Sequence, residues 1–475
     1  MSRIVLAASG SSDRKAASRL FPFDHYVRNG NHVAISSPAV ARCKSLLLLA
    51  AAALTVAGLL TRFQKDVVKT SCIDNIVELR YELGCRDTNQ QTCIEDWLWE
   101  QRTPYKYRIL GRVPIWALYR AGISLGLDED HAIYDSFVTF LLLFMASTLF
   151  LLGLLTRTLL QRIAPGLPRG MQSSLTGLAW ALFVFSPPIL FFVKYPVRGA
   201  PNDLLGYSLM IGALLLLAQR RIAWFCALSV LAVFCRETTL LMPFIFLFFD
   251  PLPWRRKLLP AALPVAVLVA YRVAWPGTYD PLPAGILLNL KFPAETLGFV
   301  LLTFGPLWLL APLGYASLRR HEAAQRDPFL RTLTASFPWA FLLTLCVCTA
   351  FSSLWEIRTS YILLFYFVPF SAIGLYLERG RIASLLKNKY FLFYLAALSI
   401  EAVRFWMWMH PTTLPELIAR ARMFGLLYIG YANSPQHNWI NIFVVYLFLS
   451  AACVPALSLL RRPQFPISGK MRQWL

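Results

Sequence analysis

The chain has 475 residues, of which 57% are hydrophobic and 15% are charged, and its mean hydropathy is +0.54. Soluble domains carry roughly 25% charged residues, so this composition excludes a soluble globular protein and indicates a polytopic membrane protein. The net charge of +21 does not indicate a nucleic-acid partner, because the basic residues form short clusters between apolar runs. That distribution is the positive-inside pattern of membrane proteins.

The apolar runs predict the fold class. Residues 1–44 are polar and basic without a hydrophobic signal region, so we expect a cytoplasmic tail there and an uncleaved signal-anchor helix at 46–60. A full span needs about 20 residues, and several runs are shorter, so we expect an all-α polytopic protein with about 11–13 transmembrane or half-membrane helices. The expected spans are 45–61, 132–155, 172–193, 204–218, 222–235, 238–250, 258–275, 294–318, 332–351, 359–377, 389–409 and 437–460.

The basic clusters predict how the run 222–250 is divided. If residues 222–250 formed one helix, the later basic clusters would fall on the side opposite to the earlier ones. Dividing the run into a helical hairpin places every cluster on the cytoplasmic side, together with a basic C-terminal tail at 461–475. Arg236 and Glu237 then lie at the outer turn of this hairpin. The clusters are Arg14, Lys15 and Arg19; Arg157, Arg162 and Arg169; Arg220 and Arg221; Arg255, Arg256 and Lys257; Arg319, Arg320, Arg326 and Arg331; Arg379, Arg381, Lys387 and Lys389; and Arg461, Arg462, Lys470 and Arg472.

Within the predicted polytopic domain, 45–460, the same assignment places residues 62–131 outside the cytoplasm as one large loop. The loop holds 11 of the chain's 25 acidic residues. The stretches "IVELRYEL", "IEDWLWEQR" and "PYKYRILGRVPIWALYRAGISLGL" predict helices that lie on or dip into the membrane interface. One disulfide among Cys72, Cys85 and Cys93 is expected if the loop meets an oxidising compartment, whereas the six other cysteines serve as small apolar residues.

Ionisable residues at membrane depth are costly and mark candidate sites. Two interpretations stay open for each group. Arg236 and Glu237 either solvate a turn or contact a substrate. Glu356 and Arg358 form either an interfacial structural pair or part of a site, and Glu401–Arg404 suits an intrahelical pair. Each loop acid is either solvated surface or a catalytic group. The remaining charges of interest are Asp66, Asp74, Lys194, Arg198 and Asp203.

Several short motifs resemble the GT-C class of integral-membrane glycosyltransferases, in the bacterial type that uses polyprenyl-phosphate sugars. "PYKYRIL" before a proline-containing amphipathic helix, "RETTLLMPF" in a middle helix and "WEIRTSYILLFYFVPF" opening a late helix carry the likeness. The layout over roughly residues 45–380 agrees with it. The chain departs from the class in its first loop. The class has an acidic pair there, and this chain has Asp66 and Asp74 singly, with the adjacent pair Glu95–Asp96 farther on.

The resemblance implies inverting transfer of a sugar to an acceptor at the extracytoplasmic face. It implies a catalytic base among Asp66, Asp74 and Asp96, and stabilisation of the leaving phosphate by arginines. The implied phosphate ligands are Arg108, Lys194, Arg198, Arg236 and Arg358. The implied residues that orient these cations or bind sugar hydroxyls are Asp203, Glu237 and Glu356.

The expected partners are a lipid-linked sugar donor, the bilayer and a glycan, lipid or protein acceptor, and no nucleic acid. These residues require no cofactor and predict no metal site, and they leave the use of a divalent metal open. The expected location is the inner membrane of a bacterial cell envelope, with both termini cytoplasmic. Two other functions stay open, a transporter or flippase for a lipid-linked or anionic solute and a polymerase or ligase of envelope polysaccharide. A transporter built from inverted repeats would show matching halves, and no internal repeat is found.

Overall fold

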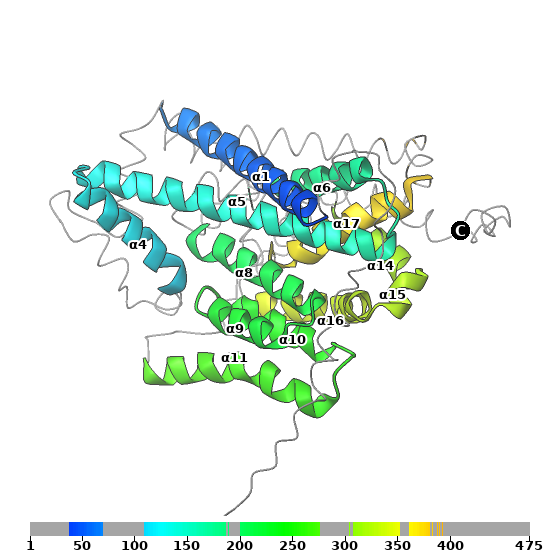
Figure 1. The fold of residues 1–475 in the computed structure, drawn as a ribbon. Coiled ribbons are helices and arrows are strands. Elements are labelled where there is room, and N and C mark those ends of the chain that lie inside the picture. The colour runs from blue at the N-terminus through cyan, green and yellow to red at the C-terminus, as the bar shows by residue number, and fades with distance from the viewer. Residues whose placement is uncertain are drawn as a thin grey trace, which may run out of the picture. The chain divides into compact units, whose positions relative to one another are not determined.

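The computed structural model describes residues 38–69, 109–186, 200–275, 307–351 and 361–380, with a few single positions beside them. In this part 88% of the residues are helical and no strand is found, so the chain is an all-α membrane protein. The elements shown in Figure 1 are α1 (Pro38–Lys69), α4 (Ile109–Ser124), α5 (Glu129–Ile163), α6 (Arg169–Val184), α8 (Ala200–Ala218), α9 (Ile222–Val233), η4 (Glu237–Leu240), α10 (Leu241–Leu247), α11 (Trp254–Ala274), α14 (Leu307–Arg320), α15 (Glu322–Arg326), α16 (Pro328–Phe351), η5 (Tyr361–Leu363) and α17 (Leu364–Leu377).

The chain forms two compact units, Met1–Leu48 and Leu49–Leu475. Of the first unit the structure describes only the start of α1. That helix begins before the predicted span 45–61 and runs on to Lys69, so the first residues of the predicted loop 62–131 are helical. This corrects the boundary drawn from hydropathy, which cannot register a helix that continues into polar sequence. All packing described below lies in the second unit.

Helices of full-span length and shorter apolar helices both occur, as the uneven run lengths predict. Four of the described helices are long and apolar enough to cross a membrane, namely Cys43–Leu60, Glu129–Ile163, Trp254–Ala274 and Pro328–Thr349. Four shorter apolar segments accompany them, namely Asp203–Ala218, Ile222–Val233, Glu237–Leu247 and Leu364–Leu377. The predicted spans 389–409 and 437–460 lie outside the described residues.

The predicted helical hairpin within 222–250 is confirmed. Helix α9 ends at Val233, and Arg236 is in the extended conformation (φ −163°, ψ 141°) before η4 begins. The Phe225 ring near the start of α9 stacks on the Phe246 ring near the end of α10, with centroids 5.1 Å apart, so the two helices run antiparallel. The carbonyl of Arg236 accepts the Thr239 hydroxyl at 2.7 Å, which fixes the turn.

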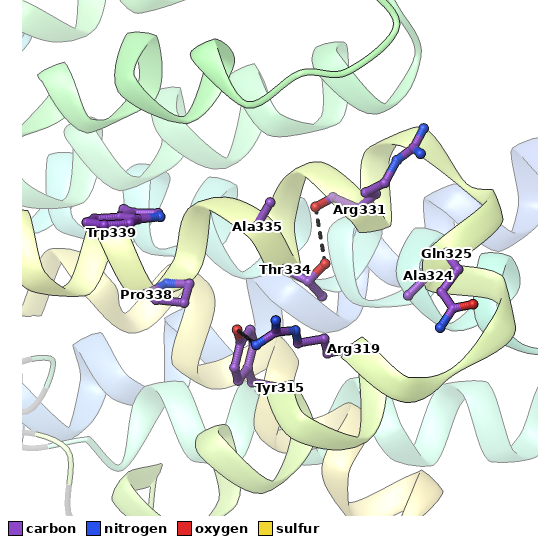
Figure 2. Close-up of a pocket in the computed structure, with 9 residues that line it drawn as sticks. All are labelled: Tyr315, Arg319, Ala324, Gln325, Arg331, Thr334, Ala335, Pro338 and Trp339. Atoms are coloured by element: carbon purple, nitrogen blue, oxygen red, sulfur yellow. Dashed lines mark hydrogen bonds between the residues drawn. The ribbon is translucent and has the colours of Figure 1, made fainter.

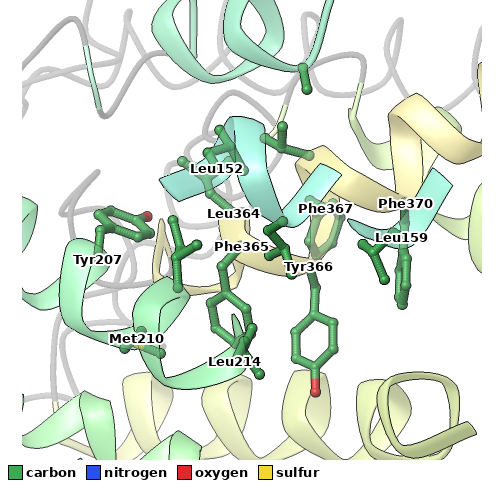
Figure 3. Close-up of a cluster of buried hydrophobic side chains, with 14 of the residues drawn as sticks. Leu152, Leu159, Tyr207, Met210, Leu214, Leu364, Phe365, Tyr366, Phe367 and Phe370 are labelled. Carbon is green, nitrogen blue, oxygen red and sulfur yellow. The ribbon is translucent and has the colours of Figure 1, made fainter. Parts of the chain in front are cut away.

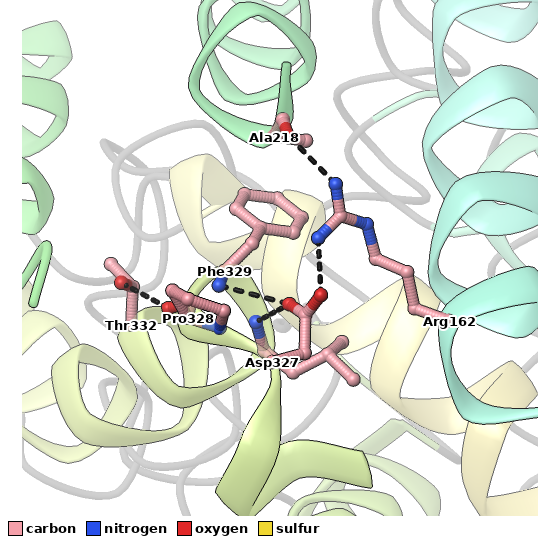
Figure 4. A network of polar contacts seen from close by, with 7 residues as sticks. Arg162, Ala218, Asp327, Pro328, Phe329 and Thr332 are labelled. Carbon is pink, nitrogen blue, oxygen red and sulfur yellow. Dashed lines mark hydrogen bonds and ion pairs between the residues drawn. The ribbon is translucent and has the colours of Figure 1, made fainter. Parts of the chain in front are cut away.

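One end of the second unit gathers the basic clusters, and we call it the basic end. Arg162 at the end of α5 donates to the Ala218 carbonyl at 2.6 Å and to the Asp327 carboxylate at 2.5 Å, joining the end of α8 to the start of α16 (Figure 4). Arg331 pairs with Asp250, which follows α10. The prediction that these clusters share one side is therefore confirmed for the described residues.

Asp327 also begins α16. Its Oδ1 accepts the backbone N–H groups of Phe329 and Leu330, both at 2.9 Å, and Pro328 follows as the first helical residue. An aspartate before an N-terminal proline satisfies helix donors that no carbonyl can reach. The Arg162 guanidinium lies over the Phe329 ring, 5.3 Å from its centroid. Every group in this network therefore has a structural partner.

The core lies where α5, α8 and α17 meet. Figure 3 shows Leu152 and Leu159 of α5 and Met210 and Leu214 of α8 beside the aromatic run of α17. The Tyr366 hydroxyl reaches the Ser336 hydroxyl of α16 at 2.5 Å, so its polar atom is satisfied inside this apolar region. Burial of aromatic and aliphatic side chains on this scale is the main source of packing energy between helices in lipid.

Helix α17 also crosses α14 at two small residues. Gly314 of α14 meets the backbone of α17 at Phe370 and Gly374, and a Cβ at Gly314 would overlap the Phe370 carbonyl oxygen. Small residues allow two helix backbones to approach this closely in membrane proteins. The two helices run parallel, because Phe304 stacks on Phe367 and the Ser317 hydroxyl donates to Glu378 at 2.5 Å.

Helix α5 extends beyond its neighbours at the end opposite to the basic end, which we call the distal end. Thr148 bonds Ser208 at 2.9 Å, and Arg162 bonds Ala218, so α5 and α8 run parallel. The start of α5 therefore extends past the start of α8 by roughly 20 Å at 1.5 Å per residue. Helix α4 packs against this extension in a buried cluster formed by Ile115, Tyr119, Ala132, Ile133, Phe137, Phe140, Leu205 and Cys235.

Candidate functional site

Four segments far apart in the sequence meet at the distal end, at the turn that follows α9. The N–H of Leu110, at the start of α4, donates to the Phe234 carbonyl at 3.2 Å. Asp203 in the first turn of α8 forms an ion pair with Arg236. The Cys348 thiol near the end of α16 interacts electrostatically with Arg236. We take the surroundings of this turn as the candidate site.

The centre of the site is a buried ion pair. Arg236 Nη1 donates to Asp203 Oδ1, and the two side chains are 8% and 2% exposed. The local sequence explains the positions of the two residues. The stretch "APND" begins α8, with a proline in the first turn, so Asp203 lies at the start of that helix. Arg236 lies in the break between α9 and η4. Desolvating two charges costs several kcal/mol per ion, so such a pair is rarely retained for stability alone.

A second ion pair lies beside the first and is less buried. Arg272 in the last turn of α11 donates to Glu237 Oε1 at 3.0 Å, with side chains 41% and 23% exposed. The ring of Tyr271 contacts Phe234 at 5.2 Å between centroids, which holds the end of α11 against the turn. Arg236 and Glu237, adjacent in sequence, thus pair with partners on different helices.

Arg112 is the largest fully buried side chain at this end. It lies in the first turn of α4, two residues after the hydrogen bond to Phe234, and is 1% exposed. A buried arginine in a membrane protein is a functional candidate by default. The sequence did not single it out, because the resemblance assigned the phosphate role to Arg108 in the preceding "PYKYRIL" stretch.

The tip of the α4–α5 hairpin carries an exposed polar cap. Asp128 precedes α5, and its Oδ1 accepts the backbone N–H of His131 at 3.0 Å, while Oδ2 lies 2.5 Å from His131 Nδ1. The backbone hydrogen bond from His131 is the main reason that the pKa of Asp128 lies below its ordinary value of 3.8. Both side chains of this cap are exposed, and the cap belongs to the helix start and not to the candidate site.

Three of the residues predicted from the sequence lie in the described part, and the structure brings Asp203 and Arg236 into direct contact. Glu237 is next to them and binds Arg272, a residue that the sequence did not single out. Asp66 lies in α1, and its side chain is outside the described residues. Also outside them are Asp74, Asp96, Arg108, Lys194, Arg198, Glu356 and Arg358.

Arg272 could have been found from its position. It is the only cation inside the apolar run 258–275, near its end, where a charge at membrane depth needs a partner. Two of the predicted residues outside the described part flank the site in sequence. Arg198 precedes Asp203 by five positions, and Glu356 follows Cys348 by eight.

Among the described residues, no group of three or more His, Cys, Asp or Glu side chains is arranged to hold a metal ion. Comparison of the chain with models of protein families, with curated proteins and with solved structures gives no match. The interpretation of the site therefore rests on its own geometry and on the sequence motifs.

Proposed function

We propose that this integral membrane protein is a glycosyltransferase that moves a sugar from a polyprenyl-phosphate donor to an acceptor, with inversion at the anomeric carbon. The observation that carries the proposal is the buried Asp203–Arg236 pair at a helix break, opposite the basic end. We propose further that the basic end faces the cytoplasm of a bacterial inner membrane, which would put the pair near the extracytoplasmic face.

In this proposal Arg236 binds the phosphate of the lipid donor. A guanidinium is a rigid fork that can meet a carboxylate on one edge and phosphate oxygens on another. Asp203 would fix the orientation of that fork, and the low dielectric around the pair would strengthen the contact with the phosphate. Arg112 and Arg272, from α4 and α11, lie at the same end and add positive charge.

The chemical step would need a base from the first loop. Asp66, Asp74 or Asp96 would take the proton of the acceptor hydroxyl, the new bond to the anomeric carbon would form, and the bond to the phosphate oxygen would break. The leaving lipid phosphate would carry the developing negative charge, which the arginines stabilise. The proposal assigns Arg108, Lys194, Arg198 and Arg358 to the same phosphate and Glu237 and Glu356 to sugar hydroxyls or cation orientation.

The decisive experiment exchanges the two members of the ion pair. The purified full chain in nanodiscs is given a radiolabelled polyprenyl-phosphate sugar, and sugar release and transfer are measured for Asp203→Arg, Arg236→Asp and the combined exchange. We expect the exchange to recover the thermal stability that each single variant loses, while transfer stays at least about a hundredfold reduced, in the range seen when one charge-stabilising group is removed.

If the exchange restores both stability and transfer, Arg236 has only a structural role and the phosphate assignment is wrong. Arg326→Gln is the control, because Arg326 is exposed at the basic end and pairs with Glu322 on its own helix. An Asp66→Asn, Asp74→Asn double variant that transfers sugar at the normal rate would exclude those two acids as the base.

A transporter of a lipid-linked or anionic solute is the second candidate, and one observation favours it. Ion pairs that are at least partly buried occur at both ends of the helices, Asp203–Arg236 at the distal end and Arg162–Asp327 at the basic end. Paired charges inside a membrane protein can mark a path as well as a one-sided site. Movement of labelled donor lipid across proteoliposomes without sugar release would favour the transporter over the enzyme.

A further inference from the structure

A surface groove lies at the basic end, away from the Asp203–Arg236 pair. It has a volume of about 580 Å³ and runs between the end of α14, α15 and the first half of α16. A smaller hollow of about 320 Å³ adjoins it and shares Tyr315, Arg319 and Gln325, adding Arg320. Among the described residues, none that lines either hollow is acidic.

The groove changes in polarity along its length. Figure 2 shows Gln325 at one end, Arg319 beside Tyr315 in the middle, and Pro338 and Trp339 at the other end. Arg319 is exposed, with Nη1 3.4 Å from the Tyr315 hydroxyl. Trp339 is 57% exposed. The groove therefore passes from cationic and amide groups to aromatic and apolar ones.

The change from polar to apolar lining follows the direction of helix α16. Its exposed positions Arg331, Ala335 and Trp339 are four residues apart, so they form one stripe on the helix surface. Trp339 is about 12 Å along the helix from Arg331, towards the middle of the span. The stripe continues with the exposed Leu342 and Leu343. Arg331 itself is engaged by Asp250, so the cations available to a ligand on this wall are those of α14.

We propose that the groove binds an anionic phospholipid. The phosphate lies against Arg319 and Arg320 with Gln325 as a hydrogen-bond donor, and the acyl chains run past Tyr315, Pro338 and Trp339. Basic hollows between membrane helices on the positively charged side select acidic headgroups, and tryptophan favours the boundary between headgroups and chains. None of the described residues that line the groove is acidic, so the charged side chains of the groove favour an anionic headgroup over a zwitterionic one.

The test titrates the purified full chain in detergent with phosphatidylglycerol and counts bound lipids by native mass spectrometry. Each basic side chain near a membrane surface contributes roughly a factor of five in affinity. The Arg319→Gln, Arg320→Gln double variant should therefore bind phosphatidylglycerol about 25-fold more weakly. Phosphatidylcholine should bind weakly to the unchanged protein and equally weakly to the variant.

The matched control is Arg255→Gln with Arg256→Gln. This is also an adjacent, exposed arginine pair at the basic end, at the start of α11 and outside the groove. It removes the same charge and should leave affinity within about twofold, since it lies outside the groove that holds the phosphate. An equal loss in both double variants would mean that the lipid responds to overall charge, and the groove assignment would be wrong.

A variant that is expected to bind the lipid more tightly distinguishes a lost ligand contact from a misfolded protein. Gln325→Arg adds a cation to both hollows and should tighten phosphatidylglycerol binding roughly fivefold, a gain that a damaged fold cannot give. Unchanged affinity in the Arg319, Arg320 double variant, or equal affinity of the natural protein for phosphatidylcholine, overturns the proposal.

Discussion

The two ends of the second unit both hold an arginine–aspartate pair, and the pairs differ in how deeply their side chains are buried. At the basic end Asp327 also accepts two backbone N–H groups, and Arg162 also reaches a helix carbonyl and an aromatic ring. The side chains of that pair are 28% and 23% exposed. At the distal end Asp203 and Arg236 are almost completely shielded.

This difference in burial distinguishes a structural contact between helix ends, Arg162–Asp327, from the candidate site around Asp203–Arg236. The Arg162–Asp327 pair ties helix ends together, and its geometry is accounted for by capping and by partial hydration. The Asp203–Arg236 pair lies at a broken helix where the ends of α4, α8 and α16 meet, and both of its side chains are shielded. Burying such a pair is costly, and the proposed function assigns it to the binding of a ligand.

The largest effect is expected for Asp203→Ala. It leaves the Arg236 charge buried without its carboxylate, which costs about 3–5 kcal/mol. A double variant, Asp203→Leu with Arg236→Met, removes both charges and should regain most of that free energy, because an apolar pair of similar volume fits a shielded site. Unfolding of the detergent-solubilised protein by increasing SDS measures both. A cost under about 1 kcal/mol for Asp203→Ala would contradict the burial of the pair.

A smaller effect is expected for Asp327→Ala, about 2 kcal/mol, as the sum of a lost helix cap and a partly exposed ion pair. Asp327→Asn keeps an acceptor for the two N–H groups and should lose only about half as much. The same SDS unfolding measures the two variants side by side. Equal losses of unfolding free energy in Asp327→Ala and Asp327→Asn would show that the helix cap contributes nothing. Capping would then not distinguish the Arg162–Asp327 pair from the Asp203–Arg236 pair.

The sequence predicted the hairpin around Arg236 because the positions of the basic clusters along the whole chain limit how many times it crosses the membrane. A single helix over residues 222 to 250 would have put the later clusters on the opposite side, and any other division of the chain needed an extra break elsewhere. Phe225 on Phe246 confirms the break. Likewise, Gly314 and Gly374 are visible in the sequence, but only packing shows that they are where α14 and α17 touch.

The partners in the site were beyond the reach of the sequence. Asp203 and Arg236 were both expected at the distal end, yet Lys194, Arg198 and Arg358 were equally good partners for an acid there. The choice depends on α8 packing on α9, which is decided by apolar side chains over the whole length of both helices. Arg112 was missed because the segment was expected to lie on or dip into the membrane interface, which does not tell which of its side chains are buried. In the structure Arg112 is buried in the first turn of α4.

A third prediction compares neighbours within the distal end. Glu237→Gln breaks the pair with Arg272, whose side chain is 41% exposed, so water takes over much of the interaction. We expect a loss of about 0.5–1 kcal/mol, the range of exposed ion pairs, against several kcal/mol for Asp203→Ala in the neighbouring pair. Arg272→Gln should give the same small loss. A loss equal to that of Asp203→Ala would mean that both pairs form one buried network.

The smallest effect concerns Asp128, which caps α5 as Asp327 caps α16. Asp128 is exposed, and it lies against His131 where Asp327 has an arginine. Its pKa in the folded protein is below 3.8, so the carboxylate stabilises the helix start above that pH. This contribution is lost as the pH falls through the folded value. Hydrogen exchange of the His131 amide, corrected for its intrinsic rate, should therefore show local opening below about pH 4 without global unfolding. Asp128→Asn keeps the acceptor but does not titrate, so the acid-induced opening should disappear. If the Asp128→Asn variant still opened in acid, the response would have to come from another group, and the contrast between an isolated cap and the paired cap at Asp327 would fail.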